Sequence, residues 1–203
     1  MRNSDGPLWV EYLTAMLNDA DLYTFARVGA TVNNSLVFRP QPDFSGQVYR
    51  YTLTEDTTEP KYDKLYFIWL GGNDIAELYN NKKYPNNNVE RDRILNDTQF
   101  TIRYNLEKLY ETGARYIICL GVNPTHLYPA NNDKTEEFRQ SYKESIMKFN
   151  ERLQTNIEDL NSRHNDSKAV FFETYKLFYS FFPEQTIMEN SKWHCNYSAI
   201  CNG

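Results

Sequence analysis

Apolar positions along the chain follow two periodicities. Three short apolar runs, at 64–70, 115–122 and 168–173, have the length and the aromatic and β-branched content of buried strands. Between them, apolar residues recur at helical spacing over 89–112 and 134–163. Strands that alternate with helices in this way predict a doubly wound parallel sheet, which is an α/β fold.

Four shorter segments complete the expected order of elements. An amphipathic helix is expected over 6–17, with Ser4 or Asp5 as its cap, and a short strand over 23–28 that breaks at Gly29. Between 35 and 63 the chain is polar, with a short helix expected near 47–51, and an aromatic helix follows the last strand at 174–182.

The stretch 64–75 carries the strongest indication of chemistry. Its apolar strand ends in Gly71-Gly72, which permit a sharp turn, and then in Asn73-Asp74. Ligands bind at the carboxyl ends of parallel strands. The Asn73 amide is a neutral donor suited to a developing oxyanion, while Asp74 is expected to cap the next turn or to hold this loop. An ordinary strand end followed by a helix cap explains the same residues.

Composition narrows the class of protein. The 203 residues suffice for one domain with a real core, and 40% of them are hydrophobic. A net charge of −5 without a basic cluster gives no indication of nucleic-acid binding. No apolar run approaches the roughly 18 residues of a membrane span, and residues 1–7 contain no apolar core of a signal peptide.

Cysteines and glycosylation sequons say little about the compartment. Three cysteines do not make a disulfide framework; Cys119 is expected in the core, while Cys195 and Cys201 either pair or stay free. Asn-X-Ser/Thr sequons occur at four positions, and roughly three are expected by chance in so Asn-rich a chain. These four are Asn33, Asn96, Asn165 and Asn196.

Three segments resemble one known family. Gly-Gly-Asn-Asp at 71–74 resembles the third sequence block of the GDSL or SGNH hydrolases, a family of esterases and lipases. Residues 25–34 resemble its second block, and residues 6–13 resemble the segment after the catalytic-serine block in secreted members. The resemblance implies that the Gly29 N–H and the Asn73 amide form an oxyanion hole, although the position before Gly29 is Val28 rather than the frequent glycine.

The family's nucleophile and general base do not match any motif of this chain. The family uses a serine in a Gly-Asp-Ser block and a histidine in a late Asp-X-X-His motif, and neither motif occurs here. Ser4, expected as a helix cap, and His194, which has Ser191 three residues before it, are weak stand-ins. His126 follows the 115–122 strand and so lies on the ligand side of the sheet, where a lone histidine is more often a rim residue.

The resemblance also implies a fold. It is a flavodoxin-like, three-layer α/β/α sandwich, and residues 1–203 are expected to form a single domain of this kind that is incomplete at both ends. The strand that bears the nucleophile in the family is then absent. We therefore expect the 23–28 strand to lack its ladder partner.

Together these features predict an ester hydrolase. It would cleave a small ester or an acylated carbohydrate or lipid through a serine nucleophile, with no metal and no organic cofactor. The resemblance favours secretion, and the residues themselves leave the compartment open. The alternative is a catalytically inactive relative that binds a glycan or a protein.

Overall fold

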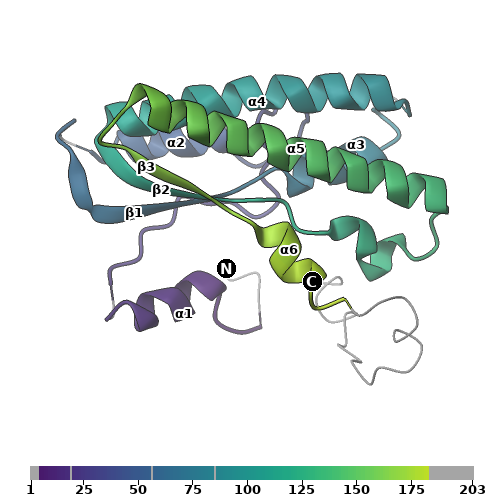
Figure 1. Cartoon of the computed structure of the whole chain (residues 1–203), viewed down its shortest axis with the longest axis horizontal. Coiled ribbons are helices and arrows are strands. Elements are labelled where there is room, and N and C mark those ends of the chain that lie inside the picture. Colours follow the sequence, from purple (N-terminus) through teal and green to yellow (C-terminus); the bar gives the residue numbers. More distant parts are fainter. Residues whose placement is uncertain (1–4, 19, 56, 85, 183–203) are drawn as a thin grey trace.

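The computed structural model describes residues 5–18, 20–55, 57–84 and 86–182, and in this part the chain is an α/β domain (Figure 1). Its sheet has three strands in the order β1-β2-β3, and both neighbouring pairs are parallel. The strands are β1 (Lys61–Trp69), β2 (Ala114–Leu120) and β3 (Lys168–Phe172). The parallel sheet predicted from the alternation of apolar runs is confirmed.

The helices fall between and around these strands. Their bounds are α1 (Trp9–Met16), α2 (Phe44–Thr52), α3 (Gly72–Asn80), α4 (Asn88–Glu111), α5 (Glu136–Arg163) and α6 (Thr174–Tyr179), with two 3-10 turns, η1 (Thr125–Leu127) and η2 (Pro129–Asn131). Each long helix begins at a side-chain cap: Asn87 accepts from the first backbone N–H groups of α4, and Thr135 accepts from Phe138 N in α5. These helices lie where the sequence predicts them.

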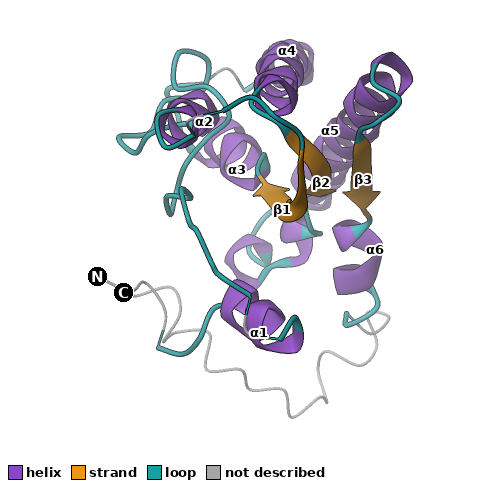
Figure 2. Ribbon diagram, turned by 90° about the vertical axis from the view of Figure 1, so that its left-hand side faces the viewer, coloured by secondary structure: helices purple, strands orange, loops and turns teal. Residues whose placement is uncertain are grey.

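The elements stack in three layers. The long helices α4 and α5 cover one face of the sheet, with α2 and α3 packed beside them, while α1 and α6 lie on the opposite side (Figures 1 and 2). Ile117 and Cys119 of β2 are fully buried in the same hydrophobic core as Ile146 and Phe149 of α5. The expected sandwich and the core position of Cys119 are confirmed, whereas Cys195 and Cys201 lie outside the described residues.

The two faces of the sheet differ in burial. On the face away from α4 and α5, Leu65 is 49% exposed, Val170 53% and Phe172 44%. The prediction that this strand is buried is therefore wrong, since five of the nine residues of β1 are exposed, three are half-buried and only Lys61 is buried. The reason is that, in the described part of the chain, only α1 and α6 lie on this side, and α1 contributes no buried residue.

Residues 23–28, expected as a short strand that lacks its ladder partner, pair with no strand of the described chain and are not assigned as a strand. No neighbouring strand is available there to accept ladder hydrogen bonds. Phe25 instead packs edge-on against Tyr51 of α2, with ring centroids 5.5 Å apart.

The first helix begins differently from the prediction. Its N-cap is Leu8, whose backbone N–H donates to the Glu11 carboxylate, so Asp5 does not cap it. Ser4 lies outside the described residues. Trp9 anchors α1 under the sheet through edge contacts with Phe67, at 5.7 Å between centroids, and with Trp69 at 6.0 Å. No helix in the described ranges is long and apolar enough to cross a membrane.

Candidate active site

Asn73 lies where β1 turns into α3, at the carboxyl end of the sheet. Gly71 is the N-cap of α3 with φ +97°, and a Cβ there would sit 2.3 Å from the Phe149 ring, so only glycine fits the turn. This turn brings Asn73 into the first turn of α3, beside the loop that holds Gly29. The Asn73 Nδ2 donates a hydrogen bond to the Ala30 carbonyl at 2.8 Å.

Gly29 lies in a tight turn next to that carbonyl. Its φ is +80°, and Ala30 N donates to Arg27 O at 3.1 Å across the turn. A Cβ on Gly29 would lie 3.3 Å from Arg39 Nη1, so this backbone also passes close to a side chain. No hydrogen bond from the Gly29 N–H is found within the described residues.

Asp74 holds the same two segments together from the inside. It is fully buried, and both of its carboxylate oxygens accept from Val32 N, at 3.0 and 3.2 Å. Burial raises the pKa of this carboxyl to about 7, although the backbone N–H donors and the Arg39 charge oppose the shift. The expectation that Asp74 caps a turn or holds the loop is met by this contact with Val32, which lies 42 residues away.

Arg39 is the nearest cation to this cluster. Its Nη2 pairs with Glu77 Oε1 of α3 at 2.7 Å, while its Nε is buried and has no hydrogen-bond partner within the described chain. Arg39 therefore connects the loop after Gly29 to α3 from the solvent side. The sequence contains no signal for this role, because the pair joins residues from two separate segments.

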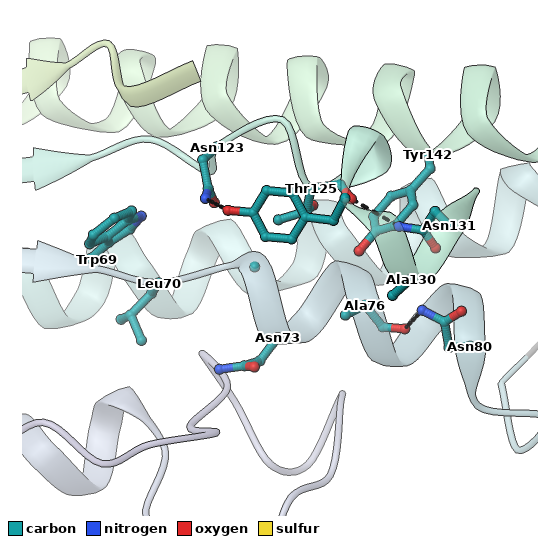
Figure 3. Close-up of a pocket in the computed structure, with 12 residues that line it drawn as sticks. Trp69, Leu70, Asn73, Ala76, Asn80, Asn123, Thr125, Ala130, Asn131 and Tyr142 are labelled. Carbon is teal, nitrogen blue, oxygen red and sulfur yellow. Dashed lines mark hydrogen bonds between the residues drawn. The ribbon is translucent and has the colours of Figure 1, made fainter. Parts of the chain in front are cut away.

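A cavity of about 450 Å³ opens beside Asn73 (Figure 3). It lies between α3 and the loop that follows β2. The cavity is lined by Trp69, Leu70, Gly72, Asn73, Ala76, Asn80, Asn123, Thr125, Tyr128, Ala130, Asn131 and Tyr142. This volume is within the range of small-molecule sites, about 300–1,000 Å³.

The loop after β2 is fixed from behind by α5. Asn150 of α5 accepts from Val122 N at 2.7 Å and donates to Val122 O at 2.9 Å. The Trp69 Nε1 donates to Gly121 O at 3.1 Å, which ties the mouth of the cavity to the end of β2. These bonds join the carboxyl ends of β1 and β2 into one rigid rim. Ligands of parallel sheets bind at this edge.

His126 is at the carboxyl end of β2 as predicted, but it does not line the cavity. It is buried against Tyr175, with parallel rings 6.0 Å apart, and its Nδ1 has no partner within the described chain. Burial lowers the pKa of this imidazole to about 4, so His126 is neutral at pH 7. Ser4 and His194 lie outside the described residues.

A family model described as GDSL-like lipase/acylhydrolase matches residues 1–199. The chain belongs to this family. An acetylesterase of Thermothelomyces thermophilus is 28% identical over 185 residues, which cover 84% of this chain and 58% of that protein. A GDSL esterase/lipase of Arabidopsis thaliana is 26% identical, covering 81% of this chain and 51% of its own length.

A secreted effector protein, SseJ of Salmonella typhimurium, is 24% identical to this GDSL family member, with 87% of this chain and 40% of the effector covered. The chain spans about half the length of the curated relatives it matches. Family and fold, both expected from the residues at 6–13, 25–34 and 71–74, are thereby shown.

The structure brings some predicted residues of this family member together and separates others. Gly29 and Asn73 are 44 positions apart in the sequence, and the Asn73 side chain donates a hydrogen bond to the carbonyl of Ala30, the residue after Gly29. His126, in contrast, does not line the cavity. Asn123 and Asn131 line the cavity as well, although neither was predicted as a site residue. Asn123 could have been predicted by the same pattern as Asn73, because both are polar residues directly after a predicted strand. No sequence pattern distinguishes Asn131 as a site residue. Within the described residues, no group of three His, Cys, Asp or Glu side chains is placed to hold a metal ion.

Proposed function

We propose that this protein is a carboxylic ester hydrolase and that Gly29 and Asn73 form its oxyanion hole. The observation that supports this most is the Asn73 Nδ2 hydrogen bond to the Ala30 carbonyl, at 2.8 Å. An Asn amide has two N–H groups, and the Ala30 carbonyl takes one. The second N–H has no acceptor within the described residues, nor has the N–H of Gly29, so both groups are available as neutral donors to an oxyanion.

These donors suit the chemistry of ester cleavage. A general base takes the serine proton as the serine oxygen adds to the ester carbonyl carbon, and the carbonyl oxygen becomes an oxyanion. The base gives this proton to the leaving alcohol; it then takes a proton from a water that attacks the acyl-enzyme and returns it to the serine as the acid leaves. Neutral donors that are fixed before the reaction stabilise the oxyanion without reorganisation, and one such donor typically contributes about 10²–10³ in rate.

No described residue is assigned as the nucleophile or the base of this proposal. Neither described histidine is at the cavity: His126 is buried behind it, and His164 pairs with Glu107 at 2.7 Å on the helical layer. Ser4 and His194 are the stand-ins that this sequence offers for those roles. The substrate is proposed to be an ester, with the acyl group left open.

Covalent labelling tests the proposal. The full-length protein is incubated with a fluorophosphonate probe, which reacts with activated serines, and the labelled peptide is identified by mass spectrometry. We expect one labelled serine, together with hydrolysis of p-nitrophenyl acetate that the probe abolishes. An unlabelled protein without hydrolysis above buffer would contradict the proposal and would leave a binding module. A protein labelled at Ser4 would place the nucleophile within this sequence.

A further inference from the structure

The cavity beside Asn73 has uncharged walls that carry several neutral polar groups. None of its twelve lining residues is charged, and eight of them carry a neutral hydrogen-bonding side chain: Trp69, Asn73, Asn80, Asn123, Asn131, Thr125, Tyr128 and Tyr142 (Figure 3). A wall without charge offers no counter-ion to an anionic or cationic ligand. A long acyl chain in this cavity would bury the remaining polar atoms of the wall amides against hydrocarbon, which costs free energy.

The wall retains unused hydrogen-bonding capacity. Asn80 Nδ2 donates to Ala76 O at 3.0 Å and Asn131 Nδ2 donates to Thr125 O at 2.9 Å, which fixes both amides in place. Within the described chain, no hydrogen bond reaches their amide oxygens, which remain as acceptors. Thr125 Oγ1 is buried in the same wall, and its polar neighbour among the described residues is the Tyr142 hydroxyl. A hydroxyl can both donate and accept, so this pair keeps hydrogen-bonding capacity for a ligand.

One side of the cavity is an aromatic platform. Trp69 is 37% exposed, and its ring is held by the hydrogen bond to Gly121 O and by contacts with Trp9 at 6.0 Å and Phe178 at 6.2 Å. A fixed aromatic face next to neutral amides matches a ring that is apolar on its faces and hydroxylated at its edge. The C–H groups of a pyranose lie on the aromatic ring, while its hydroxyls meet donors and acceptors in the plane.

We propose that this cavity binds a sugar unit as the alcohol part of the ester, with its hydroxyls on Asn80, Thr125 and Asn131 and one face on Trp69. The inference rests on the proposed function, because it assigns the alcohol side of that same site. The Asn73 amide borders both the cavity and the Gly29 turn. A sugar in the cavity therefore presents an ester oxygen beside the Asn73 amide.

Ligand-observed NMR by saturation transfer tests the inference with three probes: cellobiose as a neutral sugar, hexanoate as an acyl chain and choline as a cation. The full-length protein is titrated with each probe. We expect saturation transfer to cellobiose and none to hexanoate or choline at the same concentration. Saturation transfer to hexanoate without transfer to cellobiose would overturn the inference in favour of an acyl pocket.

Two variants tie the binding to the cavity. Thr125→Val keeps the shape and removes the hydroxyl beside Tyr142, so the fold should be retained while cellobiose binds about threefold to tenfold more weakly. Asn80→Ala, on the exposed rim, should weaken binding to a similar extent. The matched controls are Thr155→Val on the exposed side of α5 and Asn81→Ala, neither of which lines the cavity. Equal affinity in all four variants would overturn the inference.

The test separates this inference from the proposed function. Cellobiose binding that Thr125→Val weakens, in a protein that neither hydrolyses esters nor reacts with fluorophosphonate, supports the sugar site and rejects the hydrolase. Hydrolysis of p-nitrophenyl acetate without any binding of cellobiose supports the hydrolase and overturns the sugar site.

Discussion

The two glycines that follow β1 have different roles, although the sequence presents them as a pair. A Cβ on Gly71 would sit 2.3 Å from the Phe149 ring at a φ of +97°, whereas a Cβ on Gly72 would meet only Val122 Cγ1 at 4.0 Å. The turn that positions Asn73 thus depends on one glycine. The sequence predicted the need for glycine here and could not predict which residue, because the obstacle comes from a helix 78 positions away.

We predict that Gly71→Ala lowers the free energy of unfolding by about 2–5 kcal/mol, from backbone strain and overpacking against Phe149. Gly72→Ala should leave the free energy of unfolding unchanged or raise it by up to about 1 kcal/mol, because alanine is the better helix former. Urea unfolding of both variants measures the difference. Equal destabilisation by the two substitutions would show that the turn does not depend on Gly71.

Asp74 makes the stability depend on pH in an unusual direction. Its folded-state pKa of about 7 exceeds the ordinary value, so between pH 4 and 7 the folded protein binds more protons at this site than the unfolded chain. Its contribution is therefore greatest below pH 4 and is lost as the pH rises to 7, with a slope of up to about 1.4 kcal/mol per pH unit. Arg39, Asp43 and the Val32 N–H are the groups that face this carboxyl.

We predict that Asp74→Asn flattens this fall in stability. The free energy of unfolding is measured for the wild type and the variant at pH 4, 5.5 and 7. The two values should converge as the pH rises, or the variant should be the more stable protein at pH 7. The comparison with the wild type removes the contributions of Asp92, Glu107 and Asp166, whose pKa values are lowered and which destabilise the fold only at more acidic pH. A constant difference at all three pH values would contradict the prediction.

At the scale of elements, the sheet has one covered face and one partly open face. Ile117 is fully buried, while Val170, one strand over, is 53% exposed. Apolar runs predicted both strands correctly, but a run that is apolar throughout does not say whether both of its faces are covered. Residues 23–28 illustrate the same limit, since their strand-like sequence forms no ladder in the described chain, where no strand lies beside it.

This asymmetry gives a third prediction. Ile117→Ala should cost about 2–5 kcal/mol of unfolding free energy, because it leaves a cavity in the core. Val170→Ala should cost less than about 1 kcal/mol, since the side chain is half exposed. Urea unfolding of the two variants measures both values. A cost for Val170→Ala as large as that for Ile117→Ala would show that this face is covered in solution.

At the scale of the whole molecule, two sequence blocks that identify the family also meet in space. The sequence predicted Gly29 and Asn73 through their resemblance to the family, and the parallel sheet explains why loops after different elements converge at one edge. The cavity wall was not predictable to the same extent, because Asn80 and Asn131 sit in polar surroundings that look like ordinary helix ends and loops. Their placement follows from the packing of α3 against the loop after β2.

The central claim is that Asn73 stabilises the transition state of ester hydrolysis. The most direct measurement is steady-state hydrolysis of p-nitrophenyl acetate by the full-length protein and by Asn73→Ala. The control is Asn81→Ala, which removes the same side chain from an exposed position at the end of α3. We predict that kcat falls by about 10²–10³ in Asn73→Ala while KM changes little, and that the control matches the wild type. A kcat within twofold of the wild type in Asn73→Ala, or no hydrolysis by the wild type, would contradict the claim.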